Sequence, residues 1–263
     1  MKTETVLVTG ASSGIGRELA RCFAAEGCRL VLLARKRQAL QALADELRAA
    51  HKTQSEVLPA DLSQPGTPAR IFEHFQVNGP KIDVLVNNAG FGAHGQFAAL
   101  AVERQLDMVM VNVVAVTHLT RLLLPGMIER GHGGVLNVAS TAAFQPGPGM
   151  AVYYATKAFV LSFSEAVAEE LTGTGVTVTA LCPGPTDTNF NREANARFLH
   201  GFMRSAMSSK AVAQAGHSAF RKGQVVAIAG IRNQLLAQSV RLAPRSVVRK
   251  IAKWLNASSY TPS

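Results

Sequence analysis

The sequence is poor in the features that mark disulfide-rich, zinc-binding or membrane-spanning chains. Its 263 residues include only three cysteines, Cys22, Cys28 and Cys182, which are odd in number and form no CxxC pair. Neither a disulfide framework nor a metal site is indicated, and we expect a cytoplasmic protein. No apolar run approaches the roughly 18 residues of a membrane span, and the N-terminal residues lack the order of a signal peptide.

Acidic residues are missing from the last quarter of the chain. Glu193 is the final one, whereas 11 of the 27 lysines and arginines follow it, so that the formal net charge of +10 arises there. Such an asymmetry can signal an anionic partner. We do not expect nucleic acid to be this partner, because the sequence shows no recognised nucleic-acid-binding module.

Short apolar runs alternate with helical patterns along most of the chain. Hydrophobic residues make up 48% of the sequence, which is ample for a large core. Runs rich in β-branched residues predict seven strands, at 5–9, 29–34, 55–60, 82–87, 134–140, 176–182 and 224–229. Strands buried on both faces and separated by helices predict a parallel sheet in a single doubly wound α/β domain.

A glycine-rich turn, "TGASSGIG" at residues 9–16, stands between the first strand and the first helix. Gly10 allows a tight turn, while Gly14 and Gly16 let the backbone approach a pyrophosphate. Free N–H groups at the start of the helix favour the phosphate charge. The turn predicts dinucleotide binding by Gly10, Ser12, Ser13, Gly14, Ile15 and Gly16.

The end of the second strand narrows the choice of cofactor. NAD sites place Asp or Glu about 20 residues past the glycines, but no acidic residue occurs between Glu26 and Asp45. Arg35, Lys36 and Arg37 stand there instead, and a guanidinium can bind a 2′-phosphate through paired, charge-assisted hydrogen bonds. We therefore expect NADP(H), bound first by Arg35. NAD(H) stays an alternative, because a charge run is also common at the start of a solvated helix.

The stretch "YYATK" at residues 153–157 offers a tyrosine and a lysine for acid–base chemistry. Residues four apart share one face of a helix, so the spacing to Lys157 weakly favours Tyr153 over Tyr154. A free tyrosine titrates near ~10, and an adjacent ammonium favours the phenolate and lowers that pKa. Carbonyl reduction needs such a group, because a proton must reach the oxygen when a hydride reaches the carbon.

These motifs together resemble the short-chain dehydrogenase/reductase family. The T-G-x-x-x-G-I-G turn, "NNAG" (87–90), Ser140, "YYATK" and "PGPTDT" (183–188) follow the family's order over roughly residues 3–230. The resemblance implies a seven-stranded Rossmann sheet and a nicotinamide-dependent oxidoreductase that acts on CH–OH groups. It also selects Tyr153 as the acid/base, since Ser140 lies thirteen residues upstream, and leaves Tyr154 as a packing residue.

The resemblance implies the remaining site roles as well. Ser140 would hydrogen-bond the substrate oxygen, Lys157 would hold the nicotinamide ribose, and Asn112 would hold a water that links Lys157 to solvent. By itself, Asn112 reads more simply as a polar helix residue satisfied by backbone. The implied cofactor contacts are Asp61 and Leu62 at the adenine, Asn88, Ala89 and Gly90 along the cofactor, and Pro183, Gly184, Thr186 and Thr188 near the nicotinamide amide.

We divide the chain into a Rossmann catalytic domain at 1–230, with a substrate lid at about 186–222, and a helical extension at 231–263. Phe190, Phe198, Leu199, Phe202, Met203 and Met207 make the lid apolar. They suggest a hydrophobic ketone or secondary alcohol, acyl or sterol-like in character. An alternative is a catalytically silent protein of the same fold that senses dinucleotides or serves as a scaffold.

The extension predicts an amphipathic helix that begins at Pro244, a residue suited to the first helical position. Val247, Val248, Ile251, Trp254 and Leu255 mark its apolar face, and Arg245, Arg249, Lys250 and Lys253 its basic face. We expect the apolar face to pack on the domain or on a subunit partner, with contact to an anionic membrane as a secondary role. The helix at about 151–171 exposes small and apolar residues that family members use in dimers and tetramers.

Overall fold

Seven parallel strands form the centre of the protein. The computed structural model describes residues 3–188, 190 and 206–257. The strands are β1 (Thr5–Thr9), β2 (Arg29–Ala34), β3 (Ser55–Pro59), β4 (Val84–Asn87), β5 (Gly133–Val138), β6 (Val176–Cys182) and β9 (Val226–Ile228). They pair in the order β3-β2-β1-β4-β5-β6-β9, and every pairing is parallel. The predicted doubly wound sheet is confirmed.

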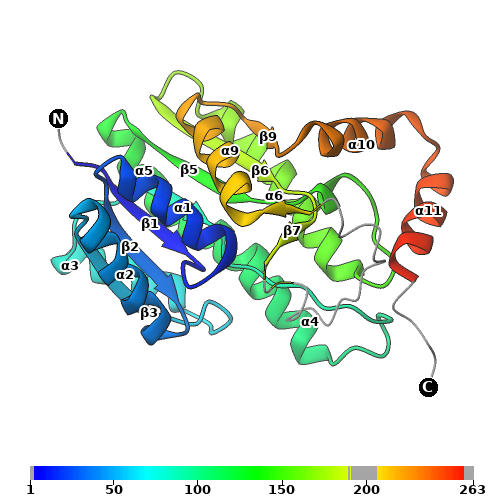
Figure 1. Ribbon diagram of the computed structural model, residues 1–263, viewed down its shortest axis with the longest axis horizontal. Helices are drawn as coiled ribbons and strands as arrows, with labels where there is room; N and C mark the ends of the chain where they lie inside the picture. The colour runs from blue at the N-terminus through cyan, green and yellow to red at the C-terminus, as the bar shows by residue number, and fades with distance from the viewer. Residues whose placement is uncertain (1–2, 189, 191–205, 258–263) are drawn as a thin grey trace.

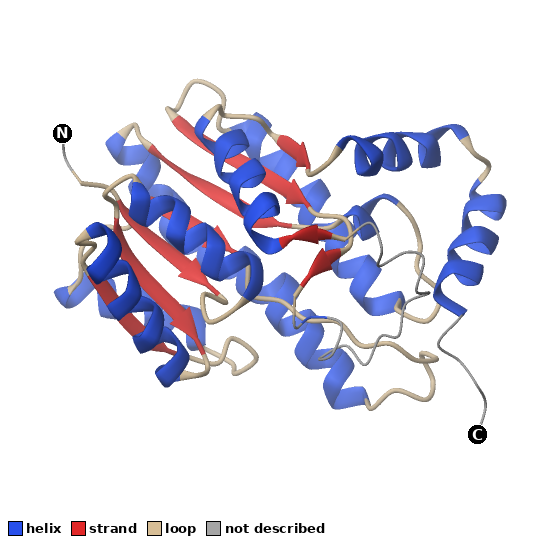
Figure 2. Ribbon diagram, viewed as in Figure 1, coloured by secondary structure: helices blue, strands red, loops and turns tan. Residues whose placement is uncertain are grey.

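Helices cover both faces of this sheet (Figures 1 and 2). One face carries α1 (Gly14–Ala25), α2 (Arg37–His51) and α9 (Ser209–Arg221), and the other carries α3 (Thr67–Asn78), α5 (Ala115–Arg130) and α6 (Ala151–Glu170). Successive side chains of a strand point to opposite faces, so Val6 and Val8 pack under the first group and Leu7 under the second. This two-sided burial explains why the strands read as continuous apolar runs.

A long helical run crosses the second face. It consists of α4 (Val102–Val109), the π-helix η1 (Met110–Val114) and α5. By length and composition alone, the stretch Val102–Arg130 could cross a membrane, because an 18-residue window within it has a mean hydropathy of 1.5. Leu119, Leu123 and Met127 are nevertheless buried against the sheet, so the run is the core helix of an α/β domain.

The predicted lid is only partly separate from the sheet layers. Two short strands, β7 (Thr186–Asp187) and β8 (Met207–Ser208), pair with each other. The next residues form α9, whose Val212, Ala213 and Phe220 lie in the core beside α1. The later part of the expected lid therefore covers the sheet, because its apolar residues recur at helical spacing. The lid residues Phe198, Leu199, Phe202 and Met203 lie outside the described residues.

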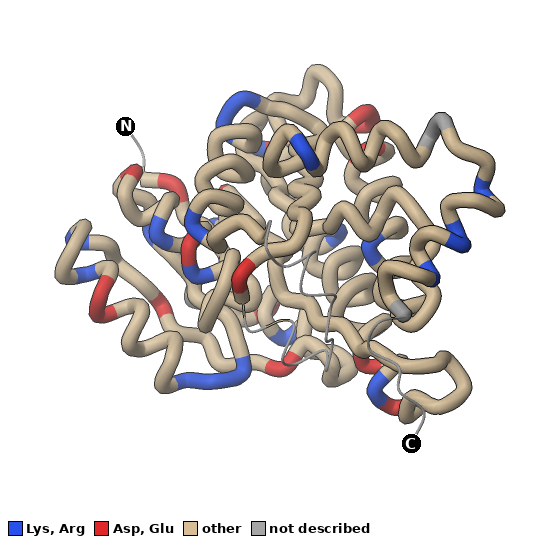
Figure 3. Tube along the Cα trace, turned by 45° about the vertical axis from the view of Figure 1, so that its right-hand side comes forward, with Lys and Arg blue, Asp and Glu red and all other residues tan. Residues whose placement is uncertain are grey.

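Two helices follow the last strand and form an arm that turns back beside the domain (Figure 1). They are α10 (Ile231–Leu242) and α11 (Arg245–Ala257), with Pro244 one position before α11 rather than at its first residue. The apolar face of α11 is split into two stripes. An inner stripe of Val248, Ala252 and Asn256 is buried, whereas an outer stripe of Val247, Ile251 and Trp254 is exposed. Figure 3 shows the lysines and arginines along this arm.

Candidate functional site

A cavity of about 540 Å³ opens at the carboxyl ends of the strands. Its lining comes from the segments that follow β1, β2, β3, β4, β5 and β6. The strand order reverses between β1 and β4, and ligands of open α/β sheets bind at such a switch point. Of the site residues predicted from the sequence, all but Gly16 and Asn112 belong to the described lining.

The glycine-rich turn after β1 and the start of α1 line this cavity. Gly10 adopts a φ of +67°, which favours glycine. A Cβ on Gly16 would lie 2.3 Å from Nδ2 of Asn88, so Gly16 lets α1 pack closely behind the turn. In this described part of the chain, Ser13 at the N-cap makes no side-chain capping bond, and the first turn of α1 carries no acidic residue. The orphan N–H groups and the positive end of the helix dipole suit a phosphate.

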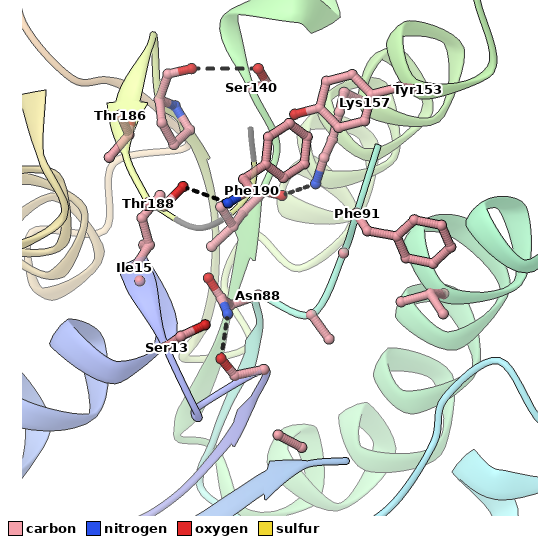
Figure 4. A pocket seen from close by; sticks show the side chains of 18 of the residues that line it. Ser13, Ile15, Asn88, Phe91, Ser140, Tyr153, Lys157, Thr186, Thr188 and Phe190 are labelled. Atoms are coloured by element: carbon pink, nitrogen blue, oxygen red, sulfur yellow. Dashed lines mark hydrogen bonds between the residues drawn. The ribbon is translucent and has the colours of Figure 1, made fainter. Parts of the chain in front are cut away.

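The segment after β4 is tied to this turn by hydrogen bonds. Asn88 donates through Nδ2 to the carbonyl oxygens of Thr9, at 2.9 Å, and Gly10, at 3.2 Å (Figure 4). Oγ1 of Thr9 accepts from the backbone N–H of Asn88, at 2.9 Å, and of Ala89, at 3.0 Å. The Asn88 amide, expected along the cofactor, thus positions the glycine turn.

Basic residues line the cavity near the end of β2 and the start of α1. Arg35 and Lys36 are exposed and line it where β2 ends, while Arg37 begins α2 outside the described lining. Arg17, which the sequence reasoning missed, also lines the cavity and donates through Nη2 to the Ser12 carbonyl at 2.7 Å. Its place just after the glycine turn was the available signal. Asp61 lines the cavity after β3, and its Oδ1 accepts from the N–H of Ser63 at 2.9 Å.

The other end of the cavity brings together Ser140, Tyr153 and Lys157 (Figure 4). Ser140 follows β5 and accepts from the N–H of Ala142 at 3.1 Å, and its hydroxyl is close enough to that of Tyr153 to affect the pKa of Tyr153. On α6, the buried Lys157 donates through Nζ to the Val138 carbonyl at 2.7 Å, and Nζ lies 5.9 Å from the centroid of the Tyr153 ring.

Burial dominates the titration of this pair. It raises the pKa of Tyr153 to about 12, although the hydrogen bond from Ser140 lowers it. It lowers the pKa of Lys157 to about 8, against a smaller raising effect of Cys182. The pKa of Tyr153 is shifted upward, whereas the sequence argument expected a neighbouring ammonium to lower it. Removal from water disfavours the charged phenolate, and the Lys157 ammonium donates to the Val138 carbonyl. Tyr153 is therefore a neutral phenol at pH 7.

Asn112 lies in the π-helix η1 and is 1% exposed. Its Oδ1 accepts from the N–H of Phe91 at 3.2 Å, and its Nδ2 donates to the Phe91 carbonyl at 3.0 Å and to Oγ1 of Thr156 at 3.1 Å. These partners match the simpler reading of a polar helix residue satisfied within the protein. The expected role in holding a water stays a prediction.

An apolar wall adjoins Tyr153. The Phe190 ring lies 5.1 Å and the Tyr154 ring 6.1 Å from the Tyr153 ring, between ring centroids, and Met150 completes the cluster. All four residues line the cavity. Tyr154, assigned only to packing, therefore has a place in the wall of the site. The glycines and prolines between Ser140 and Met150, a composition typical of binding loops, were the signal.

Within residues 3–188, 190 and 206–257, no three His, Cys, Asp or Glu side chains come together in a way that could hold a metal ion. Cys22, Cys28 and Cys182 are free thiols. Ser140, Tyr153 and Lys157 are the polar side chains at one end of the cavity whose types suit proton transfer.

Known proteins share this architecture. Residues 4–198 match the family described as short chain dehydrogenase. The chain is 41% identical over 189 residues to a Streptomyces coelicolor protein provisionally named a ketoacyl reductase, covering 71% of this chain and 72% of that protein. A short-chain dehydrogenase from Sphingobium yanoikuyae, solved in complex with NADPH, is 32% identical with a TM-score of 0.83, covering 94% of this chain and 95% of that one.

A third relative is a bulky-bulky ketone specific alcohol dehydrogenase from Comamonas testosteroni, 31% identical with a TM-score of 0.78, which covers 92% of this chain and 93% of that one. Fold, cavity and sequence agree with the motifs. The chain belongs to the short-chain dehydrogenase/reductase family and is an oxidoreductase that acts on CH–OH groups.

Proposed function

We propose that the protein is an NADP(H)-dependent oxidoreductase that interconverts a ketone and a secondary alcohol on a hydrophobic, acyl or sterol-like substrate. One observation carries the proposal. The hydroxyls of Ser140 and Tyr153 meet at one end of the cavity, against the apolar wall of Met150, Tyr154 and Phe190. A carbonyl oxygen placed between these hydroxyls would leave its apolar substituents against that wall.

The side chains would divide the work of reduction. The nicotinamide, when bound, supplies the hydride to the carbonyl carbon. Tyr153, a neutral phenol because burial raises its pKa to about 12, would give its proton to the carbonyl oxygen. Ser140 would donate a hydrogen bond to the same oxygen and stabilise its developing charge. The Lys157 ammonium would stabilise the resulting phenolate and hold the nicotinamide ribose.

The rest of the cavity fits a dinucleotide. The N–H groups at the start of α1 would bind the pyrophosphate, Asp61 and Leu62 would flank the adenine, and the 183–188 segment would contact the nicotinamide amide. Arg35 supports NADP(H), since it lines the cavity at the end of β2 where NAD sites carry an acid. The Sphingobium yanoikuyae structure contains NADPH. NAD(H) remains the second candidate.

The names of two relatives support the substrate class. The Comamonas testosteroni enzyme is described as specific for bulky-bulky ketones, and the Streptomyces coelicolor protein as a ketoacyl reductase. A bulky apolar substituent would be stabilised by burial on the Met150–Tyr154–Phe190 wall, at about 25 cal/mol for each Å² of apolar surface removed from water.

The test is a panel of ketones and secondary alcohols, graded in size, with absorbance at the reduced nicotinamide band as the readout. We expect turnover of bulky apolar members with NADPH. The Tyr153→Phe variant is the control, and it should bind NADPH with unchanged affinity while losing turnover. NADPH binding without turnover of any member would instead favour the dinucleotide-sensing or scaffolding alternative.

We further propose a cytoplasmic homodimer or homotetramer assembled through α6. On this helix Phe159 is 39% exposed, and its ring stacks on Phe163 with centroids 5.7 Å apart, an apolar patch that a second copy would cover. Size-exclusion chromatography with light scattering tests the assembly. A wild type that is monomeric, or an oligomer that the Phe159→Glu substitution leaves intact, would contradict this interface.

Contact of α11 with an anionic membrane is proposed as a secondary role. Trp254 in the outer stripe is 68% exposed, and four basic residues lie on the same helix. Each Lys or Arg near an anionic surface contributes about 1 kcal/mol. Full-length protein should sediment with anionic vesicles at low salt and release at high salt. If the Trp254→Ser variant sedimented with the vesicles as strongly as the wild type, this would contradict insertion of the outer stripe into the membrane.

A further inference from the structure

The end of α11 contacts both loops that border the apolar end of the cavity. Asn256 is 7% exposed and donates through Nδ2 to the Pro148 carbonyl at 2.9 Å. The backbone oxygen of Asn256 lies 3.1 Å from Nε2 of His94, which must be the donor because a carbonyl can only accept. The loops are also joined to each other, since the N–H of Gly95 donates to the Gly149 carbonyl at 2.8 Å.

Asn256 also reaches a residue of the cavity wall. Burial raises the pKa of Tyr154, and the neighbouring Asn256 side chain opposes that shift. Tyr154 lines the cavity beside Tyr153. The Tyr154 ring lies directly on Gly147, where a Cβ would stand 2.2 Å from the ring. The ring is thus supported from one side by the 147–150 loop, which α11 holds through the bond from Asn256 to Pro148.

Helix geometry explains why this end of α11 makes such contacts. Asn256 belongs to the last turn of the helix, whose carbonyls lack partners within it, so the bond from His94 satisfies one of them. The inner stripe residues Ala252 and Val248, one and two turns earlier, are buried and hold the helix against the domain. Neither set of contacts involves Lys157 or the glycine turn.

We propose that Asn256 is a positioning residue which makes α11 the outer support of the substrate wall. Its bond to Pro148 fixes the 147–150 loop, on which the Tyr154 ring rests. The loop and the ring thereby set the size of the substituent accepted beside Tyr153. The inference rests on the proposed function and deepens it. It assigns the C-terminal arm to substrate recognition and separates that role from cofactor binding and proton transfer.

The first test compares substrates of two sizes on the holoenzyme. Asn256→Leu keeps the volume and removes the amide, Tyr154→Phe removes only the hydroxyl, and Gln238→Ala truncates an exposed amide on α10 as the control. In the first two variants, KM for a bulky ketone should rise about tenfold, which corresponds to about 1.4 kcal/mol. In Asn256→Leu, KM and kcat for a small ketone should change less than about twofold, as should the Kd of NADPH, because the lost hydrogen bond lies away from the reacting atoms.

The double variant should show less loss than the sum of the two single ones, because both substitutions loosen the same Tyr154 ring and its loop. Equal KM values for both ketones in all variants would overturn the proposal. So would an equal fall of kcat for both ketones together with loss of NADPH binding, which would mark a general structural role. The Tyr154→Phe variant keeps the test valid if Asn256→Leu fails to fold.

A second readout does not depend on turnover. Trp254, the only tryptophan of the chain, lies two residues before Asn256 on α11. Its fluorescence anisotropy should fall in Asn256→Leu, where the end of the helix is released, and should be unchanged in Gln238→Ala. If the wild type reduced no carbonyl compound, the proposed function would fail. The anisotropy measurement would still test whether Asn256 holds α11 against the 147–150 loop. An unchanged anisotropy in Asn256→Leu would refute it.

Discussion

Replacing Arg35 with alanine should weaken NADPH binding without affecting NADH. Charge-assisted hydrogen bonds contribute about 1.5–3 kcal/mol each. Arg35 is exposed at the rim of the cavity, where solvent screens the charge, so the lower end of that range applies. A loss of about 1.5 kcal/mol corresponds to roughly a tenfold increase in the Kd of NADPH. NADH lacks the 2′-phosphate, and its Kd should change less than about twofold on the same reasoning.

Isothermal titration calorimetry of both cofactors measures this difference. Arg37→Ala is the matched control, since Arg37 belongs to the same basic run but begins α2 outside the described lining. The preference for NADPH should also narrow between about 0.1 M and 1 M salt, as the screening length falls from about 10 to 3 Å. Equal affinities of the intact protein for the two cofactors would refute the assignment, as would an equal loss of both in Arg35→Ala.

Three further outcomes are expected. Thr9→Val should lower the free energy of unfolding in urea by about 1–3 kcal/mol, because the hydrogen bonds to the 88–89 backbone are lost. Thr9→Ser keeps the hydroxyl and should lower it by only about 0.8 kcal/mol, for the missing methyl. Similar losses in the two variants would contradict a role for these hydrogen bonds. Burial lowers the pKa of Lys157 to about 8. Between pH 8 and about 10.4 the unfolded chain therefore binds more protons than the folded one. In this window the free energy of unfolding of the wild type should rise by up to roughly 1.4 kcal/mol per pH unit relative to Lys157→Met. A constant difference across that window would contradict the shift. Truncation after Gly230 should lower the melting temperature, because it removes the buried inner stripe of α11; unchanged stability with vesicle binding lost would make membrane contact the main role of the tail.

The sheet and the glycine turn could be predicted because their signals are local. The residues of β1 are buried on both faces and therefore read as the unbroken apolar run "TVLVT". The turn depends on glycines at fixed offsets, which the sequence displays directly. Ser140, Tyr153 and Lys157 could be placed together because the family spacing fixes their positions after β5 and on α6.

The remaining features depend on contacts between distant segments. Nothing local shows that Asn256 meets Tyr154, since they lie 102 positions apart. The apolar face of α11 is continuous in the sequence, and only packing divides it into a buried and an exposed stripe. The direction of the Tyr153 pKa shift depends on whether burial outweighs the effect of a nearby ammonium. Residue spacing does not reveal how deeply the hydroxyl is buried.

The π-helix η1 gives the long helix 102–130 a change of phase. One additional residue in a turn rotates everything that follows by about 100° relative to a regular α-helix. This offset lets α4 and α5 run on without a break while Asn112 faces the Phe91 loop and Leu119 faces the sheet. A single-residue deletion within Met110–Val114 would restore the regular repeat and turn one of those faces away from its partner. The length of this segment is therefore constrained independently of its composition, and homologues should vary here by substitution rather than by insertion or deletion.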